Sequence, residues 1–326
     1  MKTFRNVNAR TVAEASTFLA RNPGSAIVAG GSDVLGMVKE RLITPDALVN
    51  LRSVRALDTI SESNRELHLG ATVTLDALSR HAAIRQRYTV LAEAAGQVAT
   101  PQIRNVGTIA GNVLQRPWCW YYRNHFPCFK NGGNTCFSIT GENEFHAIFG
   151  GGPSFIVHPS DIAPALVALN ARFRIVGPRG ERVVTVSDFF QLPTVNPARE
   201  NALANDEVMA EVILPAPPNG LRSSYHKVLD REAWTHAVVS VAVALQMEGA
   251  VCRSARVVLG GVAPIPWRVP AVEAMLTGQR VTAELAARAG AKAIEGARPL
   301  AKNAYKIPLT KALIRRTILE LSNRPA

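Results

Sequence analysis

Several residue classes are scarce in this chain of 326 residues, and each scarcity argues against a class of protein. Four cysteines are too few for the disulfide framework of a small secreted domain. No run of about 18 apolar residues is present, and the N-terminus has no apolar signal-peptide region. These features favour a cytoplasmic globular protein. The periplasm is the alternative if a signal-bearing partner subunit exports the chain.

Acidic residues are outnumbered, with 25 Asp and Glu against 37 Lys and Arg, so the net charge is +12. A basic chain suggests nucleic acid as a partner when its Lys and Arg are clustered. Here they are dispersed, the longest clusters are as short as Arg315-Arg316, and only 6% of residues are aromatic. We therefore favour a solvated surface or a docking face for an acidic protein partner over nucleic-acid binding.

Apolar spacing and turn residues predict a mixture of helices and strands. The length allows two domains, and the Pro-rich segment 215–220 is the predicted linker between a domain at 1–216 and a second at 221–326. Helices are expected at 11–20, 34–40, 74–83, 90–99, 162–169, 269–276, 282–297 and 310–321. Strands are expected at 26–29, 48–51, 67–71, 172–176, 181–186, 223–228, 237–246 and 255–260. The segment 101–113 is dense in Gly, Asn and Thr and is not expected to be a simple core element.

Three loop segments, 29–35, 107–113 and 158–161, have the composition of a dinucleotide site. A strand, a glycine turn and a helix bring backbone N–H groups close to an anion. Each segment alone is a weak signal, but three in one domain support each other. Asp161 and Asn112 are candidates for a ribose hydroxyl. The G-x-G-x-x-G pattern is absent, which disfavours a nicotinamide site of the Rossmann type.

The same segments carry a resemblance to a known family. AGGSDVL at 29–35, NVGTIAGNV at 105–113, HPSD at 158–161 and the strand at 225–228 occur in the order and spacing of the FAD-binding medium subunit of molybdenum hydroxylases. This is the xanthine dehydrogenase, carbon monoxide dehydrogenase and aldehyde oxidoreductase family. The resemblance covers nearly the whole chain.

The resemblance implies an α+β fold with FAD in a cleft between two subdomains. They would lie at about 1–55 and 56–216 in an FAD-binding domain of the PCMH type, with an insertion at about 117–153. A smaller α+β domain of the carbon monoxide dehydrogenase flavoprotein C-terminal type would follow. The cofactor-binding positions that it implies are Ile27, Val28, Ala29, Gly30, Gly31, Ser32, Asp33, Val34, Gly107, Thr108, Gly111, Asn112, Val113, Ser160, Asp161, Met209 and Lys227.

The resemblance also assigns roles along the cofactor. Residues 27–34 would wrap the pyrophosphate, and 107–113 would line the flavin and ribityl side. Ser160 and Asp161 would hold the adenosine side, Met209 would add backbone contacts, and Lys227 would approach the flavin ring, where positive charge stabilises the reduced anion. Position 110 is often glycine in the family, so Ala110 is a departure that bears on flavin access.

The implied function is electron transfer. Substrate would be hydroxylated at a molybdopterin centre on a large subunit, and electrons would pass through [2Fe–2S] clusters of a small subunit to FAD on this chain. An external acceptor such as NAD, oxygen, ferredoxin or a quinone would then take them. The sequence shows no convincing acid–base pair, so we expect no catalytic residue here. It names neither the substrate nor the acceptor.

Cys119, Cys128 and Cys136 lie within eighteen residues, and Cys252 is far from them. They resemble three of four cysteines that bind a [4Fe–4S] cluster in one branch of the family, the periplasmic aldehyde oxidoreductase and 4-hydroxybenzoyl-CoA reductase flavin subunits. The fourth position is Ser154, whereas four thiolates are the rule. Two interpretations stay open: a cluster with another fourth ligand, and a cluster-free loop of three reduced thiols. Zinc is disfavoured because no C-x2-C pair is present.

Other functions fit the sequence less well. A stand-alone flavin oxidase would need its own substrate pocket and a base over the flavin, for which no candidate is visible. A basic nucleic-acid-binding protein with a metal loop would need clustered positive charge. A nucleophilic cysteine would need a base and an orienting acid, and none is indicated.

Overall fold

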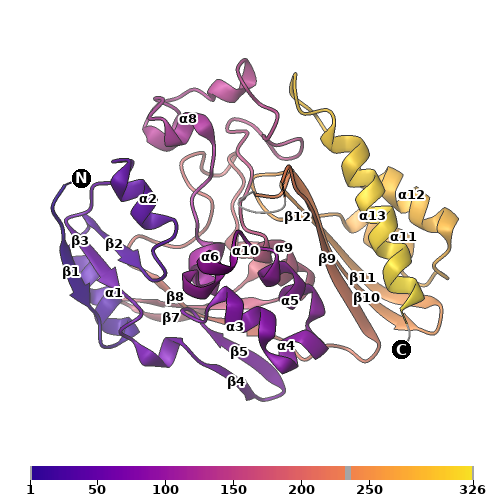
Figure 1. The fold of residues 1–326 in the computed structure, drawn as a ribbon, viewed down its shortest axis with the longest axis horizontal. Coiled ribbons are helices and arrows are strands. Elements are labelled where there is room, and N and C mark those ends of the chain that lie inside the picture. Colours follow the sequence, from indigo (N-terminus) through magenta and orange to yellow (C-terminus); the bar gives the residue numbers. More distant parts are fainter. Residues whose placement is uncertain (1, 232–235, 325–326) are drawn as a thin grey trace.

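The computed structural model describes residues 2–231 and 236–324, which form three sheets with helices packed against them. Figure 1 shows the sheets following one another along the long axis, with the N-terminal sheet at one end and the C-terminal sheet at the other. Within the described ranges, no helix is long and apolar enough to cross a bilayer. The predicted α+β class and the succession of an FAD-type region and a C-terminal region are confirmed.

The N-terminal sheet is parallel, in the order β1-β3-β2. Parallel neighbours need a crossover connection, and a helix supplies each one. The first helix begins after Thr11, whose hydroxyl accepts a hydrogen bond from the Glu14 N–H at 3.0 Å. The elements are β1 (Arg5–Asn8), α1 (Val12–Arg21), β2 (Ser25–Val28), α2 (Val34–Lys39) and β3 (Ala47–Asn50).

The central sheet is antiparallel, in the order β4-β5-β8-β6-β7. Its strands are β4 (Ile60–Ser63), β5 (Glu66–Gly70), β6 (Arg172–Gly177), β7 (Gly180–Thr185) and β8 (Val208–Leu214). The middle strand, β8, is absent from our sequence predictions. Nearly every side chain of this strand is buried, and a continuous apolar run lacks the two-residue alternation that reveals a half-exposed strand.

The region of the central sheet also contains short helices, some of which contact strands of the C-terminal sheet. They are η1 (Arg55–Leu57), α3 (Leu75–Arg80), α4 (Ala82–Arg87), α5 (Thr89–Gly96), α6 (Pro101–Val106), α7 (Ile109–Val113), α9 (Ile162–Ala168) and α10 (Val186–Phe189). The helix expected at 74–83 ends earlier, because His81 is extended and separates α3 from α4.

The segment 101–113 corrects an expectation, since it forms two helices and contributes to the core. The hydroxyls of Thr100 and Thr108 cap α6 and α7. Ile109 and Val113 of α7 are fully buried. Helices of five or six residues are too short for apolar periodicity to reveal, and the threonine caps are the signal that our sequence analysis did not use.

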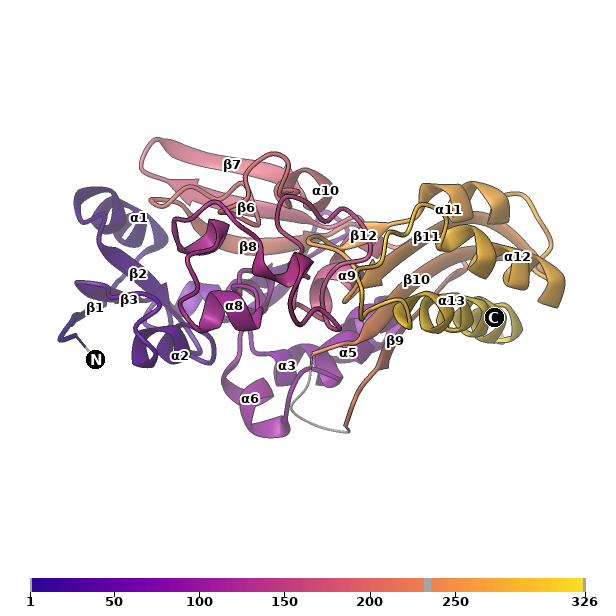
Figure 2. The ribbon, with the colours of Figure 1, turned by 90° about the horizontal axis from the view of Figure 1, so that it is seen from above.

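The insertion, residues 117–153, contains α8 (Trp120–Arg123) and the single turns η2 (Phe129–Asn131) and η3 (Phe137–Ile139). Figures 1 and 2 show it above the central sheet, between the N-terminal sheet and the C-terminal region. Its last part joins the C-terminal core. Ile148 donates a backbone hydrogen bond to Val262 at 2.9 Å, and the Phe149 ring stacks on Trp267 with centroids 5.3 Å apart.

The C-terminal sheet is antiparallel, in the order β12-β11-β10-β9; helices α11 and α13 pack against it, and α12 packs against these two helices. Its elements are β9 (Leu221–Val228), β10 (Val239–Glu248), β11 (Val251–Gly260), β12 (Trp267–Arg268), α11 (Pro270–Leu276), α12 (Ala283–Ala293) and α13 (Lys306–Asn323). Strand β10 is buried on both faces. Val241 and Val243 belong to the C-terminal core, whereas Ala242 and Ala244 belong to the core of the preceding region. The strand therefore joins the two regions.

Candidate functional site

The glycine turn between β2 and α2 approaches the backbone of another predicted loop. Gly31 has φ +76°, a conformation that favours glycine. A Cβ atom at Gly30 would lie 2.0 Å from the carbonyl oxygen of Val106. Only glycine fits there, because a backbone carbonyl cannot move aside as a flexible side chain can. The N-terminal subdomain and the loop at 106–107 thus meet at a point where side chains are excluded.

Helix α7 forms the facing wall, and hydrogen bonds lock it to the HPSD segment. The Thr108 hydroxyl accepts from the Gly111 N–H at 3.2 Å. The Ser160 hydroxyl donates to the Asn112 amide oxygen at 2.6 Å and accepts from the Ala163 N–H at 3.0 Å. Two loops far apart in the sequence are therefore held as one surface.

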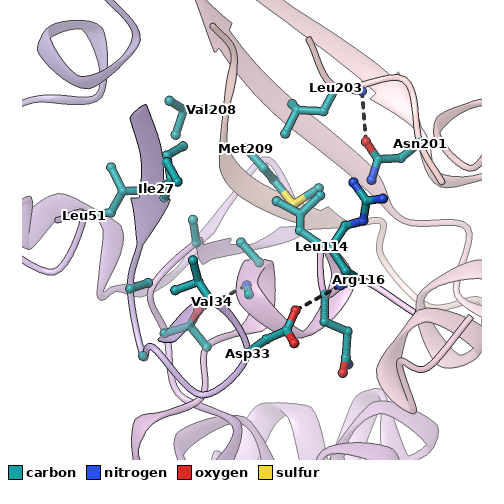
Figure 3. Close-up of a pocket in the computed structure, with 18 of the residues that line it drawn as sticks. Ile27, Asp33, Val34, Leu51, Leu114, Arg116, Asn201, Leu203, Val208 and Met209 are labelled. Carbon is teal, nitrogen blue, oxygen red and sulfur yellow. Dashed lines mark hydrogen bonds between the residues drawn. The ribbon is translucent and has the colours of Figure 1, made fainter. Parts of the chain in front are cut away.

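Between these walls lie two adjoining cavities. The first, of about 470 Å³, runs from the glycine turn to β8 and the polar segment 199–208, as Figure 3 shows. The second, of about 320 Å³, extends from the glycine turn past α7 to Asp161. Both are lined by Ser32, Asp33, Thr108 and Gly111, so they form one continuous cleft. Its length and glycine-lined middle suit a long ligand with a pyrophosphate at its centre.

Most of the predicted cofactor positions line this cleft. The first cavity contains Ile27, Ala29, Gly30, Gly31, Ser32, Asp33, Val34, Thr108, Gly111 and Met209, and the second adds Gly107, Asn112 and Asp161. Val28, Val113, Ser160 and Lys227 line neither cavity. Val113 is fully buried behind the wall, Ser160 acts on Asn112, and Lys227 acts on Asp161.

Asp161 and Lys227 form a buried ion pair that corrects one expectation. The Lys227 Nζ lies 2.7 Å from Asp161 Oδ2, and the Tyr225 hydroxyl donates to Asp161 Oδ1 at 2.7 Å. Burial, and next the negative charge of Asp161, raise the pKa of Tyr225 well above its usual value. Placing Asp161 on the adenosine side and Lys227 at the flavin ring puts these residues at opposite ends of the cofactor. Their contact shows that they belong to one end of the cleft.

The carboxylate of Asp33 is turned toward the insertion. It accepts the Arg116 backbone N–H at 2.9 Å and pairs with Arg123 at 2.7 Å, and it makes no capping bond to α2. The N–H groups at the start of this helix are therefore not capped by its own N-cap side chain. The side chain of Asp33 thus ties the glycine turn to the insertion.

Several residues of the cleft are missing from our sequence predictions. Most of them lie in the polar segment before β8, in which the sequence shows no motif. The residues of this segment that line the first cavity are Arg199, Glu200, Asn201, Asn205 and Glu207. Arg116, which lines the first cavity, is also missing, and so is Tyr225, which lines neither cavity but holds Asp161. Tyr225 belongs to the strand at 225–228 that carries part of the family resemblance, so that motif could have indicated it.

The three clustered cysteines line one small cavity together with Ser154. Its volume is about 10 Å³, the space of roughly one water molecule. Cys119 Sγ lies 3.3 Å from His146 Nε2, and Cys136 Sγ lies 3.1 Å from the Ser138 hydroxyl. Burial raises the pKa of Cys119 to about 11, which keeps its thiol protonated. Among the described residues, no three His, Cys, Asp or Glu side chains are arranged to hold a metal ion. As folded, this loop does not fit a four-iron cluster.

Comparison with known proteins shows which family the chain belongs to. Residues 2–217 match the FAD binding domain in molybdopterin dehydrogenase, and residues 224–321 match the CO dehydrogenase flavoprotein C-terminal domain. The chain belongs to this family of FAD-binding subunits. The resemblance found in the sequence is thereby confirmed, and the chain is an FAD-binding member of an oxidoreductase family.

Individual members of the family are similar to this chain over most or all of its length. The chain is 36% identical to the aldehyde oxidoreductase FAD-binding subunit PaoB of Escherichia coli over 330 residues, which is 98% of each chain. It is 28% identical to the carbon monoxide dehydrogenase medium chain of Afipia carboxidovorans, covering 79% of this chain and 74% of that one. The solved carbon monoxide dehydrogenase of Hydrogenophaga pseudoflava is similar with a TM-score of 0.79 at 26% identity, covering 99% and 98% of the two chains.

The residues of the cleft fit FAD by their own geometry. Gly30 packs against the Val106 carbonyl, so the glycine turn and the loop at 106–107 meet in the middle of the cleft with no side chain between them. Asp161, held by Lys227, supplies hydrogen-bonding groups at one end of the cleft, and the segment 199–208 supplies polar side chains at the other.

Proposed function

We propose that this chain is the electron-transferring flavin subunit of a heteromeric molybdenum hydroxylase. Bound FAD would supply two-electron and one-electron redox chemistry. Residues 27–34, 107–113 and 209 would hold it in the cleft. The observation that carries the proposal is the continuous cleft between glycine turns, which has room for a cofactor.

The protein's own residues would orient the cofactor. The backbone of residues 30–34 would face the pyrophosphate, and α7 would set the opposite wall. We propose that the Asp161–Lys227 pair lies at the flavin end, because its cavity leads away from the polar segment 199–208. We also propose two domains, at 1–216 and 221–326. The first would consist of subdomains at about 1–55 and 56–216.

The partners that we propose are a molybdopterin-binding large subunit and a [2Fe–2S] small subunit, and the acceptor is external. Support comes from the relatives, one of which is named a medium chain of carbon monoxide dehydrogenase and another an aldehyde oxidoreductase subunit. Because identity to the aldehyde oxidoreductase subunit is 36%, aldehydes are the substrate class to test first. A cytoplasmic location stays a prediction.

The experiment is affinity purification of the tagged chain from its native cells, followed by anaerobic addition of an aromatic aldehyde. We expect two further subunits to copurify and the flavin absorbance to bleach. Purification of a flavin-containing chain without partners would contradict the subunit proposal and favour the stand-alone oxidase.

The iron content of that complex tests the cysteine loop separately. We infer that Cys119, Cys128 and Cys136 stay reduced thiols, and no step of the proposed function passes through a cluster here. Two [2Fe–2S] clusters on a partner contain about four iron atoms, and a [4Fe–4S] cluster would raise the total to about eight. A measured value near eight would restore the cluster and contradict our inference.

A further inference from the structure

A separate cavity of about 230 Å³ lies where the Pro-rich linker meets the C-terminal sheet. One wall is the linker segment 215–218, another is the end of α9, and the third is one face of β10 and β11. On this face Arg256 lies opposite Ala244, and the next pair along the strands is Gln246 and Ser254. Residues opposite each other in an antiparallel pair point to the same side of the sheet. None of the lining residues lines the cleft described above.

Arg256 brings a positive charge to this cavity, and none of the described residues that line it is acidic. The side chain is half-buried, and its guanidinium makes no hydrogen bond or ion pair within residues 2–231 and 236–324. The carboxylate whose charge reaches it, that of Glu273, pairs with Arg268 at 2.6 Å and accepts the Val257 N–H at 3.1 Å. Burial, and next the charge of Arg268, lower the pKa of Arg256. The cavity thus holds a cation without a counter-charge of its own.

The other polar groups of the cavity also favour a ligand that accepts hydrogen bonds. Gln246 Oε1 accepts the Ser254 hydroxyl at 3.1 Å, whereas the amide N–H groups of Gln246 have no acceptor in the described part of the chain. On the linker, the Pro215 carbonyl already accepts the Tyr88 hydroxyl at 3.0 Å. Unused donors beside a positive charge match a small oxyanion, since carboxylate and phosphate oxygens accept several hydrogen bonds each. The volume is below the range typical of sites for larger ligands.

We propose that this cavity binds a small oxyanion, phosphate or a carboxylate, between Arg256 and Gln246. The inference is independent of the proposed function, because the cavity and the cleft share no lining residue. A bound anion would contact the C-terminal sheet and the linker at once. It would therefore hold the linker against β10 and β11 and stabilise the folded chain by mass action.

The test is isothermal titration calorimetry of the full-length chain with inorganic phosphate and, separately, with acetate, at constant ionic strength. Saturating FAD is present, so that the glycine turns of the cleft are not open to phosphate. We expect saturable binding of at least one anion, and the tighter of the two identifies the group. Arg256→Met keeps the stem of the side chain and removes its charge, so it should raise the dissociation constant about tenfold. Gln246→Leu removes a neutral donor and should raise it less.

Arg253→Met is the matched control, because Arg253 lies on the same strand, carries the same charge and does not line the cavity. It should bind the anion as the unmodified chain does. Arg256→Lys keeps the charge without the planar fork and should restore part of the affinity. No saturable binding of either anion, or equal affinity in Arg256→Met, Gln246→Leu and the control, would overturn the proposal. A chain that binds no FAD would instead refute the proposed function and would leave the ranking of these variants unchanged, so the two failures are distinguishable.

Discussion

At the residue scale, the cleft depends on a few positions where a single atom decides the geometry. Gly30 is the clearest, because its Cα faces the Val106 carbonyl so closely that no side chain fits. The Asp161–Lys227 pair is another. The two side chains are only 5% and 1% exposed, so each buried charge is neutralised by the other and not by water.

Gly30→Val should therefore separate the two walls of the cleft and abolish FAD retention. The two added methyl groups and the Cβ would meet a backbone carbonyl, which can move only if the turn or α6 shifts. FAD released from the purified variant by acid measures the effect. Gly36→Val is the control, because a Cβ at Gly36 meets nothing within 4 Å. Normal FAD content in Gly30→Val would contradict the role that we assign to the turn.

His158 provides a pH prediction. Burial lowers its pKa from 6.5 to about 3, so the folded chain binds this proton less readily than the unfolded chain. The resulting stability is fully present above pH 6.5 and is lost as the pH falls toward 3. Between pH 6.5 and 4 the loss is about 3 kcal/mol. Urea unfolding of the unmodified chain and of His158→Gln should show the difference in slope. Parallel pH profiles would refute it.

At the element scale, the insertion is a brace between the N-terminal subdomain and the C-terminal core. Arg123 reaches Asp33 in the glycine turn at 2.7 Å, and Lys130 reaches Glu200 beside the cleft at 2.5 Å. At its other end, buried Lys306 donates to the carbonyl oxygens of Phe145 and His146 at 2.9 and 3.1 Å. The segment that carries the three clustered cysteines thus supports the wall of the cleft.

Arg123→Met should weaken FAD binding and lower the free energy of unfolding by about 2 kcal/mol, because it leaves a mostly buried carboxylate with one partner fewer. Chemical denaturation and FAD titration measure the two effects. Arg253→Met is the control, because its ion pair with Glu248 is exposed on both sides and its loss should change neither quantity. An Arg123 variant that behaves like this control would show that the brace has no effect on the cleft.

The same scale shows what the sequence could and could not predict. The strands and helices around the glycine turns were predictable, because caps, turns and periodicity agree there. Strand β8 and helices α6 and α7 were not, since one is apolar throughout and the others are too short. The cleft followed from motifs, but the contribution of residues 199–208 depends on a tertiary contact. The proximity of Asp161 to Lys227 also needed coordinates, because 66 residues separate them.

At the scale of the whole molecule, strand β10 shares its two faces between two cores, which fixes the cleft and the C-terminal sheet in one arrangement. The chain carries a net charge of +12, which suits docking to an acidic partner.

Assembly with partner subunits should therefore weaken as salt rises. Exposed charges attract over a Debye length of about 10 Å at 0.1 M salt and about 3 Å at 1 M. The association rate of the chain with its copurified partners, measured by surface plasmon resonance, should fall several-fold between these concentrations. A rate independent of salt would show that the positive surface serves another purpose.

The central claim is that this chain holds FAD in the cleft between its glycine turns. The most direct measurement is the amount of FAD released per chain from the purified, full-length protein, with the released cofactor identified by mass spectrometry. When the chain is produced alone, without its partner subunits, the account predicts about one FAD per chain. A correctly folded chain that carries no flavin and binds none when FAD is added would contradict it.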